Sequence, residues 1–154
     1  MWALLILICG GAFLSIPIED YAMIGDCHTA ALVSKQGSID WLCLPNFDSP
    51  ACFAALLGTA EHGRWSISPA EPLRSIRRSY RDGSLILETT FETESGSATL
   101  IDCMIPRTGM PELLREVFRA AGGTHDDWPT YDRVMAEERR AAVLISPERV
   151  YPNA

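Results

Sequence analysis

Positive charge is scarce in this sequence, and lysine is almost absent. Only one of the 13 cationic side chains, Lys35, is a lysine, and 20 acidic side chains outnumber them. The net charge of −7 argues against nucleic acid as a partner, because phosphate binding needs a basic face. Apolar residues nevertheless make up 47% of the 154 residues, which excludes a disordered chain and suffices for one domain with its own core.

Cysteine shows no spacing that would indicate a disulfide framework or a metal site. The chain has 5 cysteines, an odd number, and no C-x-x-C pair. We expect mostly buried or half-buried free thiols. The neighbours Cys27 and His28 leave a metal or nucleophile site open, but adjacent side chains of a strand point to opposite faces. We therefore predict no metal site and no cofactor.

The common catalytic motifs are also missing. The sequence contains no glycine-rich phosphate loop, no G-x-S-x-G and no H-E-x-x-H. Its acidic residues do not by themselves define an acid–base pair, because such a pair depends on geometry. We predict no catalytic residue in this chain.

Only the N-terminus carries a long hydrophobic run. Met1–Ile16 has no charged side chain. It is shorter than the roughly 17–20 apolar residues of a membrane-spanning helix, and it lacks the cationic start of a signal peptide. Three interpretations stay open: a signal peptide or short anchor, a buried apolar segment, and a start codon upstream of the natural one. We expect a cytoplasmic protein, with membrane anchoring or export through Met1–Ile16 as the alternative.

What the sequence does contain is a series of short alternating segments separated by turn residues. The expected strands are Ala30–Ser34, Ser38–Leu44, Arg64–Ser68, Arg74–Tyr80, Leu85–Glu94 and Ser97–Ile105. In the fifth of these, Leu87 and Phe91 share one face while Glu88 and Glu92 share the other, as in a strand with one solvated face. Short turns favour antiparallel pairing, so we predict a mainly β fold, an antiparallel β-sandwich.

Two further patterns predict short helices. Asp48-Ser49-Pro50 is typical of a helix start and favours a helix over Ala51–Leu57, ended by Gly58. Glu112–Ala121 has apolar residues at helical spacing, a weaker helix is expected over Asp132–Ala142, and short strands over Val143–Ile145 and Arg149–Tyr151. We therefore expect a partly helical C-terminal tail that does not pair with the preceding strands. The sandwich would then be incomplete, and its uncovered apolar face would cause self-association.

The candidate binding residues are Trp41, Asn46 and Asp48, at the end of one expected strand and in the loop after it. An indole ring can stack on a sugar face, while amide and carboxylate groups bond its hydroxyls. The alternative is that Trp41 and Phe47 belong to the core and that Asp48 caps a helix.

Several motifs resemble one known family. They are PIEDYAMIG at Pro17–Gly25, GSIDWLCLPNFDSP at Gly37–Pro50, RRSYRDGSLILETTFET at Arg77–Thr93 and LIDCMIP at Leu100–Pro106. Together they resemble the N-terminal domain of glycoside hydrolase family 15, the bacterial trehalase and glucoamylase-like proteins. The resemblance implies an N-terminal β-sandwich that braces an (α/α)6 barrel. In that barrel two glutamates hydrolyse α-glucosidic bonds with inversion. It also implies that the loop matched by Trp41–Asp48 approaches the sugar, with Asn46 in place of an arginine that is often found there.

This resemblance divides the chain into an apolar leader (1–16), a sandwich segment (17–107) and an unassigned tail (108–154). A chain of 154 residues is too short for the barrel, and the catalytic glutamates have no counterpart. We therefore expect a non-catalytic N-terminal domain fragment whose partner is the barrel, and which binds an α-glucoside at most weakly. The alternatives are a subunit of a split hydrolase that complements a separate barrel, and a stand-alone carbohydrate-binding module.

Overall fold

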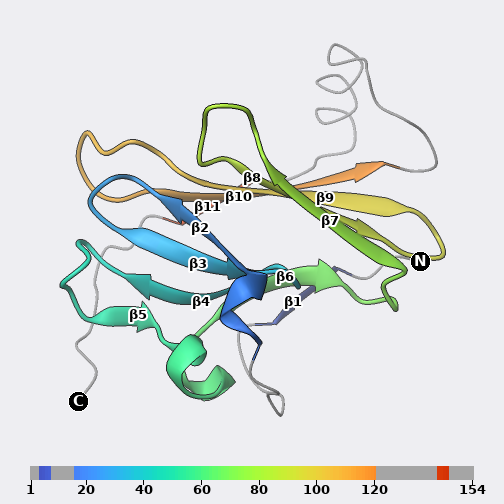
Figure 1. The fold of residues 1–154 in the computed structure, drawn as a ribbon, viewed down its shortest axis with the longest axis horizontal. Coiled ribbons are helices and arrows are strands. Elements are labelled where there is room, and N and C mark those ends of the chain that lie inside the picture. Colours follow the sequence, from blue (N-terminus) through green and yellow to red (C-terminus); the bar gives the residue numbers. More distant parts are fainter. Residues whose placement is uncertain (1–3, 8–15, 121–141, 146–154) are drawn as a thin grey trace.

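In the computed structural model the backbone is described for residues 4–7, 16–120 and 142–145, and the side chains for residues 16–117. Nearly all regular elements in these ranges are strands, which form two antiparallel sheets that face each other (Figure 1). The first sheet contains β1 (Leu4–Leu7), β2 (Tyr21–Gly25), β3 (Ala30–Ser34), β4 (Ser38–Cys43), β5 (Ala51–Phe53) and β6 (Trp65–Pro69). Its strand order is β1-β6-β4-β3-β2, with β5 paired to β4.

The second sheet has the order β11-β10-β9-β8-β7. Its strands are β7 (Ser75–Tyr80), β8 (Leu87–Glu92), β9 (Ser97–Met104), β10 (Leu113–Ala120) and β11 (Ala142–Ile145). The helices in the described ranges are single 3-10 turns: η1 (Ile18–Asp20), η2 (Ala55–Leu57) and η3 (Ala60–His62). The mainly β, antiparallel fold expected from the sequence is confirmed, and β11 confirms the short strand expected over Val143–Ile145.

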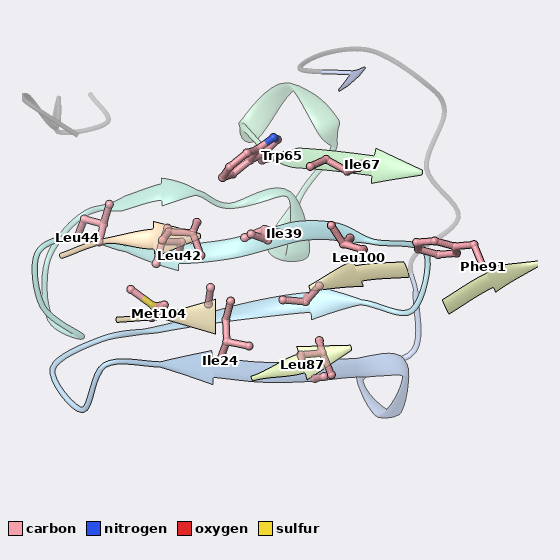
Figure 2. Close-up of a cluster of buried hydrophobic side chains, with 14 residues drawn as sticks. Ile24, Ile39, Leu42, Leu44, Trp65, Ile67, Leu87, Phe91, Leu100 and Met104 are labelled. Atoms are coloured by element: carbon pink, nitrogen blue, oxygen red, sulfur yellow. The ribbon is translucent and has the colours of Figure 1, made fainter. Parts of the chain in front are cut away.

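The core lies between the two sheets, and both contribute to it (Figure 2). Buried side chains include Ile24, Val33, Ile39 and Leu42 from the first sheet and Leu87, Phe91, Leu100 and Met104 from the second. Along β8 the burial alternates as the sequence predicts, and Phe91 lies opposite Ala98 of β9. The hairpin of β8 and β9 therefore has the expected register.

A bulge in β4 explains why its pattern is less regular. Leu32 pairs with Trp41, whereas the next residue, Val33, pairs with Ile39, so Asp40 is an extra residue on β4. The bulge lets Ile39 and Leu42, three positions apart, both contribute to the core. Trp41 precedes the core residue Leu42 and is only half-buried, on the other face of the sheet.

The helix expected over Ala51–Leu57 is wrong. Ala51–Phe53 pairs with β4 as β5, and only the 3-10 turn η2 follows before Gly58. The reason lies in Ser49, whose hydroxyl accepts a hydrogen bond at 3.0 Å from the backbone N–H of Asn46. The polar residues that resemble a helix cap therefore close the preceding loop instead.

The helix expected over Glu112–Ala121 is wrong as well. These residues form β10, which pairs with β9 from Leu113 opposite Met104 to Ala120 opposite Ser97. The inward positions are Leu113, Arg115 and Val117, with Arg115 only 1% exposed. Because one inward position is an arginine, the apolar residues of this segment do not alternate every second residue as in a strand with an apolar core face. Their spacing in the sequence instead matches that of a helix.

The tail therefore does pair with the preceding strands and helps to cover the core. Leu87 and Phe91, the residues expected to lack a facing layer, are 1% and 2% exposed. The helix expected over Asp132–Ala142 lies outside the described residues except at Ala142, which begins β11, and the strand expected over Arg149–Tyr151 lies wholly outside them.

Within the N-terminal run, Leu4–Leu7 pairs with β6. None of the helices in the described ranges has the length and hydrophobicity that a bilayer crossing requires.

Candidate functional site

Three loops come together at one end of the sandwich (Figure 1). They are the β2–β3 turn (26–29), the β4–β5 loop (44–50) and the β9–β10 loop (105–112). Two of the candidate residues, Asn46 and Asp48, lie in the β4–β5 loop, and both are exposed. Trp41 does not join them, because it lies within β4 opposite Leu32 and is half-buried.

Arg107 connects the three loops. Its Nε and Nη2 atoms lie 2.9 Å and 2.8 Å from Oδ2 of Asp26, in the β2–β3 turn. Its Nη1 atom donates to Oδ1 of Asn46 at 3.1 Å, and Nη2 also donates to the carbonyl of Pro45. The side chain of Arg107 is 12% exposed and that of Asp26 is fully buried, so this ion pair is largely shielded from water.

Asp26 organises the β2–β3 turn as well. Its Oδ1 atom accepts hydrogen bonds from the backbone N–H groups of His28 at 2.9 Å and Thr29 at 2.8 Å. Burial by itself raises the pKa of this carboxyl group. The backbone donors and the Arg107 guanidinium outweigh burial and hold the pKa below its usual value. Asp26 is therefore an ionised structural group.

The tip of the β4–β5 loop is held from both sides. The hydroxyl of Ser49 accepts from Asn46 N–H, and Ser49 N–H donates to the carbonyl of Asn46 at 3.1 Å. The backbone N–H of Phe47 donates to the carbonyl of His28 at 3.0 Å. Phe47 is 63% exposed, so the alternative that places it in the core is wrong. The tip presents an amide, an aromatic ring and the carboxylate of Asp48 to solvent.

Sequence reasoning missed Arg107. It lies 81 positions from Asp26 and 61 from Asn46, so no local pattern joins them. The signal that was available is a cation in a loop, directly after Pro106, with no acidic residue beside it.

The other buried carboxylates also have structural partners. Asp40 accepts hydrogen bonds from the hydroxyls of Ser38 and, at 2.7 Å, Tyr21. Burial and this bond raise the pKa of Tyr21. Asp102 lies 2.7 Å from Nε of Arg115, and both side chains are fully buried. Asp40 and Asp102 therefore serve the fold.

The thiols agree with expectation except at one position. Cys43 is buried, and Cys52 and Cys103 are half-buried, whereas Cys27 is exposed; Cys9 lies outside the described residues. Burial raises the pKa of Cys52 to about 11, which disfavours its reactive thiolate. Within the described ranges no group of three or more His, Cys, Asp or Glu side chains is placed to hold a metal ion.

Comparison with known proteins gives a consistent assignment. The profile of the family described as "Trehalase-like, N-terminal" matches residues 10–117. A trehalase of Mycolicibacterium smegmatis is 40% identical over 89 residues, which are 58% of this chain and 13% of that protein. Trehalase 1 of Sulfolobus acidocaldarius is 42% identical over 100 residues, 65% of this chain and 17% of that protein.

A trehalase of Mycobacterium tuberculosis is 39% identical over 89 residues, again 58% of this chain and 13% of that protein. No solved structure matches. The chain thus spans less than a fifth of the length of these curated relatives. Because the profile match covers most of the chain and includes strands β2 to β9 and the first part of β10, the chain belongs to the family of trehalase-like N-terminal domains.

Proposed function

We propose that the chain acts as the non-catalytic N-terminal domain of a trehalase- or glucoamylase-like α-glucoside hydrolase and braces an (α/α)6 catalytic barrel. The observation that carries this proposal is the match of the N-terminal domain profile to residues 10–117. Relatives named trehalase continue far beyond the matched part: the match covers 13% of the Mycolicibacterium smegmatis protein. We infer that the catalytic groups of such a hydrolase lie in the part that this match does not cover.

The state of the buried acids supports a structural role. Inverting hydrolysis needs one carboxyl group to protonate the leaving oxygen and another to activate water, about 6.5–9.5 Å apart with room for the water. Asp26, Asp40 and Asp102 are each held by buried or half-buried partners within the fold. Such groups position side chains and strands rather than a substrate.

The thiols fit a cytoplasmic location for the protein. Cys43, Cys52 and Cys103 are free, although all three are at least half-buried. Free thiols persist in reducing compartments, of which the cytoplasm is one.

The direct test is hydrolysis by the purified chain. We expect no glucose release from trehalose or maltose above a buffer blank, under conditions in which the Mycolicibacterium smegmatis trehalase is active. Release that rises in proportion to the concentration of the chain, and that survives Asp48→Ala, would overturn the non-catalytic assignment.

A domain exchange tests the bracing role. The 89 matched residues of the Mycolicibacterium smegmatis trehalase are replaced by those of this chain, and a second variant lacks the segment altogether. We expect the exchanged enzyme to hydrolyse trehalose and the deletion variant to be inactive. Activity that does not need the segment would contradict bracing.

The exposed amide and carboxylate of Asn46 and Asp48 favour, as a second candidate, a stand-alone carbohydrate-binding module. Calorimetric titration of the chain with trehalose tests it. Binding at millimolar concentration that is lost in Asn46→Ala and Asp48→Ala would favour this second function. Absence of binding would leave bracing as the function.

A further inference from the structure

We propose that Arg107 is the positioning residue that fixes the β4–β5 loop in the conformation with which this domain contacts the rest of the hydrolase; this inference rests on the proposed function. The loop itself offers little to hold it. Pro45, Asn46, Phe47 and Asp48 are all exposed, and the bonds within the tip are the two between Asn46 and Ser49.

Two attachments tie the tip to the rest of the described structure. One is the backbone bond from Phe47 N–H to the carbonyl of His28. The other is Arg107, which donates to the carbonyl of Pro45 and to Oδ1 of Asn46. Arg107 thus bonds to this loop with a side chain that comes from the β9–β10 loop, 61 positions away from Asn46.

The position of Arg107 is itself fixed. Its guanidinium makes two contacts with the buried carboxylate of Asp26, and Asp26 is held in turn by the backbone N–H groups of His28 and Thr29. A planar guanidinium can contact a carboxylate with two nitrogens and still donate elsewhere, which a lysine ammonium cannot do in the same geometry. The hydrogen-bonded β2–β3 turn thereby sets the position of the loop tip through Arg107.

The loops that Arg107 joins carry exposed apolar side chains. Phe47 is 63% exposed, and in the β9–β10 loop Met110 is 62% and Ile105 is 40% exposed. Groups of this kind bind more tightly when their loops are ordered beforehand, because the entropy of ordering is not lost on binding. The occupant that fits is the remainder of the hydrolase, since the matched relatives continue well beyond this domain.

Hydrogen exchange on the full 154-residue chain tests the positioning. In Arg107→Ala we expect the exchange of the amides of Phe47 and Ser49 to accelerate by roughly tenfold or more beyond any acceleration at Val33 and Leu42, which report the global stability. Arg107→Lys is expected to restore little of the protection. The matched control is Arg77→Ala. It removes an exposed arginine of β7 that pairs with Glu92 of β8, and it should leave the exchange of Phe47 and Ser49 unchanged.

Unchanged exchange at Phe47 and Ser49 in Arg107→Ala would overturn the proposal. Should Arg107→Ala not fold, Asn46→Ala removes the exposed acceptor and leaves the buried ion pair intact. The same amides are then expected to exchange faster.

The domain-exchanged trehalase shows whether the fixed loop matters to the enzyme. We expect Arg107→Ala to lower kcat/KM roughly tenfold when it is assayed well below its own melting temperature, which falls because the buried carboxylate of Asp26 loses its partner. Normal kcat/KM despite faster exchange in the loop would overturn the role in contact. An inactive parent exchange would contradict the proposed function, while the exchange rates would still decide whether Arg107 positions the loop.

Discussion

Arg115 is a charged side chain that lies between the two sheets and bonds to both. Beside its ion pair with Asp102 in the second sheet, it donates to the carbonyls of Gly37 at 2.7 Å and Trp65 at 2.5 Å on the first sheet. Its guanidinium also lies 5.0 Å from the centre of the Trp65 ring. Burial raises the pKa of Asp102, although Arg115 favours its ionised form. Desolvation therefore offsets much of the free energy that the ion pair between Arg115 and Asp102 contributes to folding.

The first prediction concerns this ion pair. Arg115→Met leaves the carboxylate of Asp102 buried without its partner, so we expect the free energy of unfolding to fall by about 3–5 kcal/mol. The double variant Arg115→Met/Asp102→Leu should recover part of the loss, because no buried charge remains. Urea unfolding measures both. A double variant no more stable than Arg115→Met would contradict this account.

The second prediction concerns the pH dependence of stability through Asp26. Its pKa in the folded chain lies below the ordinary value of 3.8, so the folded state binds fewer protons than the unfolded state between the two values. The stabilisation from Asp26 is therefore present above about pH 4 and is lost as the pH falls through the folded pKa. The urea concentration at the unfolding midpoint, measured from pH 2 to 7, should therefore fall less steeply with decreasing pH in Asp26→Asn than in the unmodified chain. The exposed Asp82→Asn serves as the control, and equal slopes for the two variants would refute the assignment.

At the scale of elements, the β3–β4 turn is built into the core rather than projecting from it. Gly37 has a φ of +82°, and a Cβ atom there would lie 2.4 Å from the carbonyl oxygen of Ile67 and 2.9 Å from Cζ of Phe91. Gly83, in the β7–β8 turn, has a φ of +67° with nothing within 4 Å of such an atom. The two turns share a backbone conformation but differ in what surrounds them.

The third prediction uses this pair of glycines. Gly37→Ala combines left-handed strain with a backbone clash, so we expect a loss of about 2–4 kcal/mol in the free energy of unfolding. Gly83→Ala carries only the strain and should lose about 1–2 kcal/mol. Chemical denaturation of both variants gives the comparison. Equal losses of stability in the two variants would show that a Cβ atom at position 37 does not clash with Ile67 and Phe91.

The fourth prediction concerns the register of the β8–β9 hairpin. Phe91 is 2% exposed, so Phe91→Asp replaces a large apolar side chain with a charge and should lose at least about 4 kcal/mol or prevent folding. Thr90, on the opposite face, bonds to the hydroxyl of Thr99, and Thr90→Lys should lose less than about 1 kcal/mol. Circular dichroism melts separate the two outcomes, and a reversed order would mean that the register is shifted by one residue.

At the scale of the whole molecule, side chains of the second sheet close the edge of the first. The hydroxyl of Tyr80 in β7 donates to the carbonyl of Met23 at 2.8 Å and accepts from its N–H at 2.9 Å. Arg78 donates to the carbonyls of Asp20 and Val33. Backbone groups at the edge of β2 are thus paired by side chains, which lowers the tendency of that edge to aggregate.

The fifth prediction follows from the position of β10. Because β10 supplies Leu113 and Arg115 to the covered core, we expect the full chain to be monomeric and to melt cooperatively. This replaces the expectation of self-association, whose premise of an unpaired tail is wrong. A chain ending at Pro111 lacks β10 and should associate. Light scattering on both chains is the measurement, and association of the full chain to the same degree would contradict the role of β10.

The sequence by itself determined the strands whose inward positions are apolar. Leu87 and Phe91 show their two-residue period directly, because the hydrophobic effect selects apolar residues for a buried face. The family was determined at the same level, since its motifs lie in short contiguous segments such as Gly37–Pro50.

Only the tertiary structure decided the rest, because it depends on pairs distant in the chain. β10 is a strand whose inward Arg115 is tolerated only because Asp102 lies opposite it on β9. The candidate loop likewise bonds to Arg107, whose ion-pair partner Asp26 lies 81 positions away in the chain. The local spacing of apolar and polar residues predicts which side chains are buried and which are solvated. A buried charge does not follow this spacing, because its burial depends on the partner that folding brings next to it.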